Sequence, residues 1–282
     1  MNWMEIATYV GQVAAFVGVY GVIFLAGKLF KDILTPYSLL EQQVKKDNPA
    51  VGVSVAGYFF ATAIIFVGVL SGPSNGFIDD ILTVAKYSVL GLVFLNLSRI
   101  CLDKLIFPKF CDNTEITEEQ NIALGTVRGC AYIATGLIAA GSLNGQGGDI
   151  FTACAFFVLG QAVLLVFSRF YDWITPYCLH QEIDDRNLSA GIAFGGMLIA
   201  LGIIIGRAVM GNFYGWTENL LIFAEMAVAG IILLFVVRWI MDRLILTGHD
   251  LNEEISKDKN VAAGFAEMSI AVSFALVLAA LV

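Results

Sequence analysis

Charged residues and histidines are scarce in this 282-residue chain, and both shortages exclude particular classes of function. Only 14% of the residues are Asp, Glu, Lys or Arg, and 24 acidic residues outnumber 16 basic ones. The net charge of -8 leaves no basic surface for nucleic acid, which we exclude as a partner. Both histidines, His180 and His249, lie outside the apolar stretches, which argues against haem held by two histidines. No Ser-His set or paired Asp indicates a protease, so we do not expect an enzyme.

Cysteine is also sparse, and its spacing is uninformative for metal binding. The five cysteines form no C-x-x-C motif and are scattered through the chain: Cys101, Cys111, Cys130, Cys154 and Cys178. Structural zinc sites normally combine closely spaced Cys and His pairs. We therefore predict free thiols, no metal site and no cofactor.

Apolar residues make up most of the sequence. They make up 58% of the sequence, and the mean hydropathy is +0.80, so the lipid bilayer is the expected surroundings. About 20 apolar residues of helix cross the hydrocarbon, and only helices satisfy every backbone group within one segment there. The sequence predicts an all-α fold with eight spans: Ile6–Leu25, Ala50–Val69, Val84–Leu102, Ile122–Leu143, Ile150–Phe167, Leu188–Ile205, Leu220–Val237 and Val261–Leu281.

The basic residues gather at one end of these spans. This end should face the cytoplasm, because cytoplasmic loops of membrane proteins are enriched in Lys and Arg. Both termini are then non-cytoplasmic, and a bacterial inner membrane is the expected location. The set comprises 13 of the 16 basic residues: Lys28, Lys31, Lys45, Lys46, Arg99, Lys104, Lys109, Arg169, Arg186, Arg238, Arg243, Lys257 and Lys259.

The motif Asn-x-(Ala/Ser)-x-Gly occurs four times, once at the start of each even-numbered span. The first and third copies are 139 residues apart, as are the second and fourth, which indicates a duplicated four-helix unit. We predict repeats at residues 1–145 and 146–282. Because four is an even number of spans, the repeats should be parallel, related by a pseudo-two-fold axis along the membrane normal. The motif residues are Asn48, Gly52, Asn121, Gly125, Asn187, Gly191, Asn260 and Gly264.

Two interpretations of this motif stay open. In the first, each Asn caps a helix that begins at the membrane surface, and each Gly allows close helix packing. In the second, the four positive helix ends form an ion or head-group site.

Four ionisable residues lie inside the predicted spans. The 139-residue offset places Lys86 opposite Glu225 and Arg128 opposite Glu267, so one repeat carries bases where the other carries acids. We predict two intramembrane ion pairs, Lys86 with Glu225 and Arg128 with Glu267. These pairs either fix how the repeats dock or form a polar path. Gln161, a lone polar residue in its span, is expected to bond to a neighbouring helix.

The four motif copies, each preceded by an acidic segment, resemble a bacterial inner-membrane family called domain of unknown function 350. The Thr35-Pro36-Tyr37 turn before the second span adds to the likeness. Typical members look like one four-span unit, so this chain looks like two units fused. The resemblance implies an inner-membrane location and cytoplasmic partners of the envelope-stress type. It implies no established activity or catalytic residue.

Two functions remain as hypotheses. The leading one is a channel or transporter-like protein that moves an ion or small cation along the repeat interface, which predicts a wet cavity reaching the four charged residues. The alternative is a non-conducting scaffold that recruits cytoplasmic partners, which predicts a dry, tightly packed seam. Association into a homo-oligomer is left open.

Overall fold

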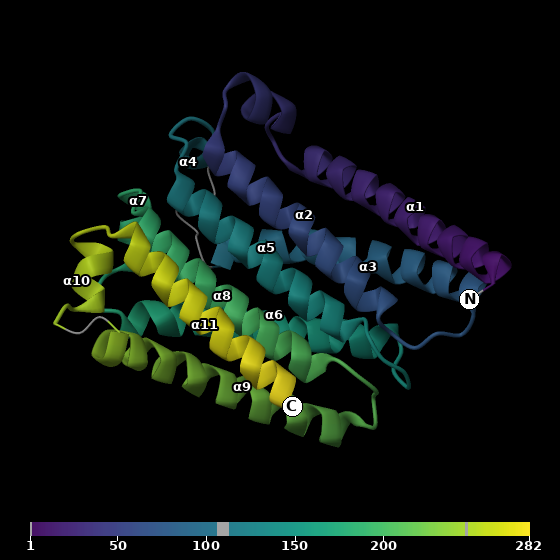
Figure 1. Cartoon of the computed structure of the whole chain (residues 1–282). Helices are drawn as coiled ribbons and strands as arrows, with labels where there is room; N and C mark the ends of the chain where they lie inside the picture. Colours follow the sequence, from purple (N-terminus) through teal and green to yellow (C-terminus); the bar gives the residue numbers. More distant parts are fainter. Residues whose placement is uncertain (1, 106–112, 246–247) are drawn as a thin grey trace.

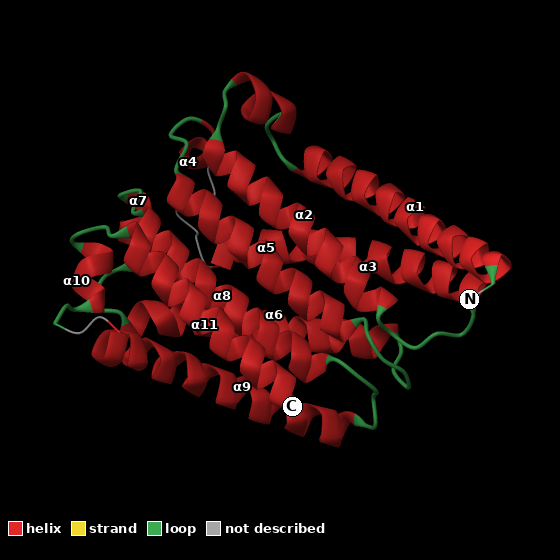
Figure 2. Cartoon of the chain, viewed as in Figure 1, coloured by secondary structure: helices red, strands yellow, loops and turns green. Residues whose placement is uncertain are grey.

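The computed structural model describes residues 2–105, 113–245 and 248–282, without the side chains of 102–105 and 244–245. The side chain of Lys104, together with Lys109 and Cys111, therefore lies outside the described residues. Every regular element in the described ranges is a helix (Figure 2). The eight long helices are α1 Trp3–Leu34, α2 Pro49–Leu70, α3 Phe77–Leu105, α5 Ile122–Ser142, α6 Ile150–Ile174, α8 Leu188–Val209, α9 Trp216–Ile240 and α11 Val261–Leu281.

These eight helices are long and apolar enough to cross a membrane, which confirms the predicted fold class. They form four hairpins: α1 with α2, α3 with α5, α6 with α8 and α9 with α11 (Figure 1). A short helical segment lies in each hairpin loop, and we call this end of the molecule the short-helix end. The segments are η1 Glu41–Lys45, α4 Thr114–Thr117, α7 Leu179–Asp184 and α10 Leu251–Ser256; η3 Met241–Ile245 continues α9.

The second helices of the hairpins form a row. Along it, α2 packs on α5, α5 on α8 and α8 on α11 (Figure 1). Each also lies against the first helix of the following hairpin: α2 contacts α3, α5 contacts α6, and α8 contacts α9. Each second helix of the first three hairpins therefore fills the groove between the two helices of the next.

This arrangement does not confirm the predicted pseudo-two-fold axis. Under two-fold symmetry the contact of α5 with α8 would recur between α11 and α2, but those two helices lie at opposite ends of the row (Figure 1). The units instead join head to tail. The physical reason is that all four second helices carry similar small faces, so each fits the next one in the same way.

Glycines allow the backbones in this row to approach closely. A Cβ atom built at Gly191 of α8 would lie 2.9 Å from the carbonyl oxygen of Ala123, and one at Gly264 would lie 2.6 Å from that of Ser189. Gly125 meets the Ala50 backbone in the equivalent place. Close backbone contact through small residues is the usual way that helices associate in lipid. Gly52, on the first helix of the row, has nothing within 4 Å.

Candidate functional site

The four motif asparagines cap their helices, as the first interpretation predicted. The Oδ1 atom of Asn48 accepts from the backbone N–H of Ala50 at 3.0 Å, and that of Asn121 accepts from Leu124 at 3.1 Å. Asn187 and Asn260 cap α8 and α11 in the same way. Each cap satisfies N–H groups that a helix start otherwise leaves unpaired.

The asparagines also join neighbouring hairpins, which the sequence did not predict. The Nδ2 group of Asn48 donates to the Ile116 carbonyl at 2.8 Å, and that of Asn121 donates to the Ile183 carbonyl at 2.7 Å. Asn187 donates to the Ile255 carbonyl at 2.7 Å. Each of these three motifs thus holds its own helix start and the short helix of the following hairpin. We call this hydrogen bond the asparagine clasp.

Each clasp depends on an unusual backbone conformation. The residue before every motif Asn has a positive φ angle between 47° and 56°, although none of the four is glycine: Asp47, Gln120, Arg186 and Lys259. This left-handed residue ends the short helix and turns the chain into the next long one. Such a conformation is uncommon for residues with a side chain, so its fourfold recurrence marks a conserved geometry within the chain.

The last asparagine differs from the other three. Asn48, Asn121 and Asn187 are buried, whereas Asn260 is exposed. Its Nδ2 group donates to Glu254 within the same hairpin at 2.7 Å. Within the residues that the structure describes, no short helix of another hairpin offers a carbonyl to Asn260 Nδ2.

The predicted pair of Arg128 with Glu267 is wrong. Glu267 is fully buried on α11 and pairs with Arg238 of α9, within its own hairpin. Arg128 lies half-buried on α5, and α8 packs between α5 and α11. The prediction assumed that equivalent helices face each other across a two-fold axis, and the row separates them instead.

A polar cluster surrounds the buried ion pair. Arg238 donates to the hydroxyl of Tyr171 at 3.0 Å and to Oδ1 of Asn252 at 2.7 Å, and it lies over the Tyr171 ring. The Tyr171 and Tyr177 hydroxyls are 3.3 Å apart. Burial raises the pKa of Tyr177, which keeps this phenol neutral at physiological pH. Because the neighbouring phenol carries no charge, the opposite charges of Arg238 and Glu267 compensate each other inside the protein.

The predicted pair of Lys86 with Glu225 is not formed either. Both side chains are exposed, Lys86 on α3 and Glu225 on α9. Lys86 Nζ lies 5.2 Å from the centre of the Tyr87 ring. Among the ion pairs of the described residues, none joins Lys86 to Glu225. The helix α6 contacts both α3 and α9 through aromatic pairs, which explains why the two charges do not meet.

The first repeat buries a different charge, Lys31 of α1, which is only 2% exposed. Its Nζ atom donates to the Tyr132 hydroxyl at 2.6 Å and lies 4.2 and 5.1 Å from the ring centres of Tyr132 and Tyr58. Such cation–π contacts stabilise a desolvated ammonium group. Lys31 precedes Asp32 as Tyr171 precedes Asp172 in the second repeat. This alignment of Lys31 with Tyr171 could have indicated that Lys31 lies inside the bundle. Lys31 was instead assigned to the cytoplasmic surface.

A third polar group lies where the two repeats meet. Gln161 of α6 accepts from Ser98 of α3 at 2.5 Å and from Thr135 of α5 at 3.4 Å. This confirms that Gln161 bonds to neighbouring helices. The Nε2 atom of Gln161 is buried without a hydrogen-bond partner in the described part of the chain. The same is true of the Oγ atom of Ser88 on α3.

A polar pocket of about 300 Å³ opens at the end opposite the short helices. It lies where the loops after α2, α5 and α8 approach one another. Lys86, Arg128, Glu225 and Glu267 are not among its lining residues. The polar part of the lining includes Asn75, Thr83, Asn144, Gln146, Asp149 and Asn219.

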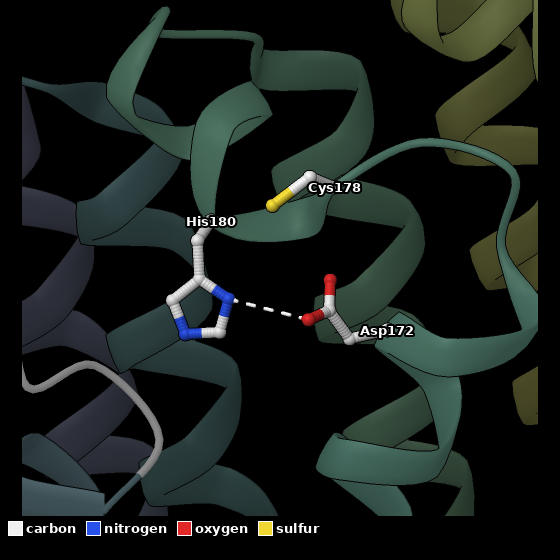
Figure 3. A group of neighbouring side chains, drawn as sticks. All are labelled: Asp172, Cys178 and His180. Atoms are coloured by element: carbon white, nitrogen blue, oxygen red, sulfur yellow. Dashed lines mark ion pairs between the residues drawn. The ribbon is translucent and has the colours of Figure 1, made fainter.

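Asp172, Cys178 and His180 gather beside the start of α7 (Figure 3). Asp172 Oδ2 lies 3.5 Å from His180 Nδ1, while its Oδ1 accepts from the Leu179 N–H at 2.8 Å. In the last hairpin, Asp242 makes the same bond to the N–H of Leu251, the first residue of α10. Capping of the short helix therefore accounts for Asp172 without a metal ion.

These features define a class of protein: a multi-pass membrane protein built from head-to-tail helical hairpins. The chain belongs to the family described as Domain of Unknown Function (DUF350), whose model matches it twice, over residues 4–143 and 147–282. The two tandem units expected from the 139-residue offset are thereby confirmed.

Two relatives support a membrane location. The UPF0719 transmembrane protein of Aquifex aeolicus (strain VF5) is 24% identical over 179 residues, which cover 61% of this chain and 65% of the relative. The UPF0719 inner membrane protein YjfL of Escherichia coli (strain K12) is 29% identical over 82 residues, covering 27% and 62%. The chain thus spans just under two thirds of the length of each relative. No solved structure matches the chain.

Proposed function

We propose that the protein is a non-conducting scaffold of a bacterial inner membrane, with the short-helix end in the cytoplasm and both termini on the other side. The observation that carries this proposal is the close backbone contact between the repeats. At the junction of α5 and α8, Gly191 and Gly195 lie directly against Ala123 and Cys130. Helix backbones this close leave no room for a water-filled path between them.

The intramembrane charges support the same function. The carboxylate of Glu267 is held by Arg238, and the ammonium group of Lys31 is held by two tyrosines. Groups fixed in this way contribute to folding, because removal of one partner leaves a buried charge without compensation.

The short helices supply the surface that a scaffold needs. Each hairpin places one of them at the same end, and exposed acids lie on or beside them, including Glu41, Asp184 and Glu253. The partners we propose are cytoplasmic proteins of the envelope-stress type with a basic docking face, because opposite charges steer and orient association.

Ion flux tests this function directly. Purified protein in liposomes should pass protons, K⁺, Na⁺ and a polyamine no faster than empty liposomes do. A flux above that background would contradict the scaffold. In a parallel experiment, E41K/D184K/E253K should lose a cytoplasmic partner that the unmodified protein retains. Its thermal midpoint in detergent should stay unchanged, because all three side chains are exposed.

A permeation path is the second candidate, and one specific observation favours it. The polar pocket opens at the end opposite the short helices, and the Ser98, Thr135 and Gln161 group lies at the repeat junction. If this route conducts, Q161L should abolish the flux while Q12L on α1, outside the junction, should not. Equal flux through both variants would rule out a route past Gln161.

A further inference from the structure

We propose that copies of this protein bind head to tail, with α11 of one copy filling the groove between α1 and α2 of the next. This inference is independent of whether the protein conducts. It rests on an interface that the chain already uses three times, between α2 and α5, α5 and α8, and α8 and α11.

Each second helix carries two faces that recur at fixed distances from its motif Asn. The forward face, which contacts the following hairpin, consists of the residues 2, 5, 9 and 13 positions after the Asn. In α2 these are Ala50, Val53, Gly57 and Ala61. All four lie against glycines of α5: Ala50 meets Gly125, Val53 and Gly57 meet Gly129, and Ala61 meets Gly136. The same spacing places Ala123, Cys130 and Ala134 of α5 against Gly191, Gly195 and Gly202 of α8.

The forward face of α11 has the same character, but no part of the chain that the structure describes covers it. Three of its four residues are small, and all four are exposed: Ala262, Phe265, Ser269 and Ser273. Above this face, Asn260 is exposed, whereas the other three motif asparagines are buried under the next short helix. The helix α11 therefore carries both parts of the forward contact, namely the small face and the motif asparagine.

The rear face, which receives the preceding helix, lies 4, 8, 15 and 19 positions after the Asn. In α8 it consists of Gly191, Gly195, Gly202 and Gly206, all in close contact with α5. In α2 the same positions hold Gly52, Ala56, Ala63 and Val67, and all four are exposed or half-buried. Glycine destabilises an exposed helix relative to alanine by about 0.5–1 kcal/mol, so packing within a single copy does not explain Gly52.

An apolar groove of about 390 Å³ identifies the place for the incoming helix. It lies between α1 and α2 and is lined by Phe16, Tyr20, Ala63, Phe66 and Val67, among others. The corresponding grooves of the next three hairpins are occupied by α2, α5 and α8. A second copy is the occupant that fits, because α11 continues the series that already fills the other three.

One polar residue of the first hairpin, Gln43, favours a contact between separate copies at this surface. Ile116, Ile183 and Ile255, which supply the clasped carbonyls inside the row, are fully buried. Gln43 occupies the equivalent position in the first hairpin and is exposed. We assign its carbonyl as the acceptor for Asn260 of the neighbouring copy. Interfaces that form between separate chains carry such polar rims, and the head-to-tail contact builds rings or filaments.

Disulfide cross-linking in membranes tests this assembly. With the five native cysteines replaced, A56C and S269C are introduced together, matching the internal pair of Gly195 and Cys130. Oxidation should give a ladder of dimers and larger species. S269C alone should stay monomeric, because a head-to-tail contact does not place two copies of residue 269 together. A56C with V228C, on the outer face of α9, is the collision control.

The outcomes separate the alternatives. A dimer formed by S269C alone would overturn the proposal in favour of a symmetric contact, and equal yields for V228C and S269C would reduce it to random collision. A monomer in all samples would mean that lipid or another protein covers α11. Adding G52L to the A56C/S269C protein should remove the ladder without lowering the thermal midpoint, since nothing lies within 4 Å of Gly52.

Discussion

The packed interior of the molecule and its exposed faces contain the same residue types in opposite surroundings. Glu267 is buried against Arg238 whereas Glu225 is exposed on α9, and Asn187 is buried in a clasp whereas Asn260 is exposed. Gly191 touches a neighbouring backbone whereas Gly52 touches nothing. The difference teaches that a motif residue stabilises this fold through the neighbour it meets. Each matched pair therefore offers a substitution and its own control.

The carboxylates should show the largest difference. Glu267→Ala leaves Arg238 buried without its counter-charge and should lower the free energy of unfolding by about 3–5 kcal/mol. Glu225→Ala should change it by less than about 0.5 kcal/mol, because that side chain is exposed. Denaturant titration in bicelles measures both. Similar losses for the two variants would mean that the ion pair contributes nothing to stability.

The two asparagine substitutions should show the next largest difference in stability. Asn187→Ala removes a helix cap, worth about 1 kcal/mol, and leaves the buried Ile255 carbonyl without its donor, which costs about 1–3 kcal/mol more. Asn260→Ala removes the cap and an exposed hydrogen bond to Glu254, but it leaves no buried carbonyl without a donor. The same titration should thus place Asn187→Ala well below Asn260→Ala in stability. Equal values would show that the clasp bonds are energetically silent.

The glycines should give the smallest effects, but of opposite sign. Gly191→Ala forces the α8 backbone away from Ala123 and should destabilise the protein by about 1–3 kcal/mol. Gly52→Ala meets no atom and should be neutral or stabilising by up to about 1 kcal/mol in the dispersed protein. Thermal midpoints in detergent are sufficient to read the sign. A destabilising Gly52→Ala would show that this face is already occupied in the dispersed state.

The eight spans and the helix caps could be predicted because each depends on a local pattern. Apolar length defines α2 and α8, and Asn48 or Asn187 bonds to N–H groups two or three residues away. The neighbours of a helix are not local information. The 139-residue offset shows that α5 and α11 are equivalent, but a closed pair and an open row contain the same offset. The pairing of Arg128 with Glu267 failed for this reason.

The buried Lys31 and Arg238 were missed for a related reason. Both lie near the ends of long helices, where basic residues normally extend to the membrane surface. In the structure α1 continues to Leu34 and α9 to Ile240, so tertiary contacts with tyrosines cover both side chains. Hydropathy records where the apolar stretch stops and not how far the packed bundle continues.

The distance between α2 and α11 within one chain tests the open row most directly. Spin labels at A56C and S269C are introduced in a chain whose native cysteines are replaced, and this chain is diluted with an excess of unlabelled protein so that only intrachain pairs contribute. Three steps of about 8–10 Å separate the axes of α2 and α11 by about 24–30 Å. Both labels lie on outward faces of the row, so double electron–electron resonance should give a distance at least this long. A separation near one such step would contradict the row and restore the two-fold arrangement.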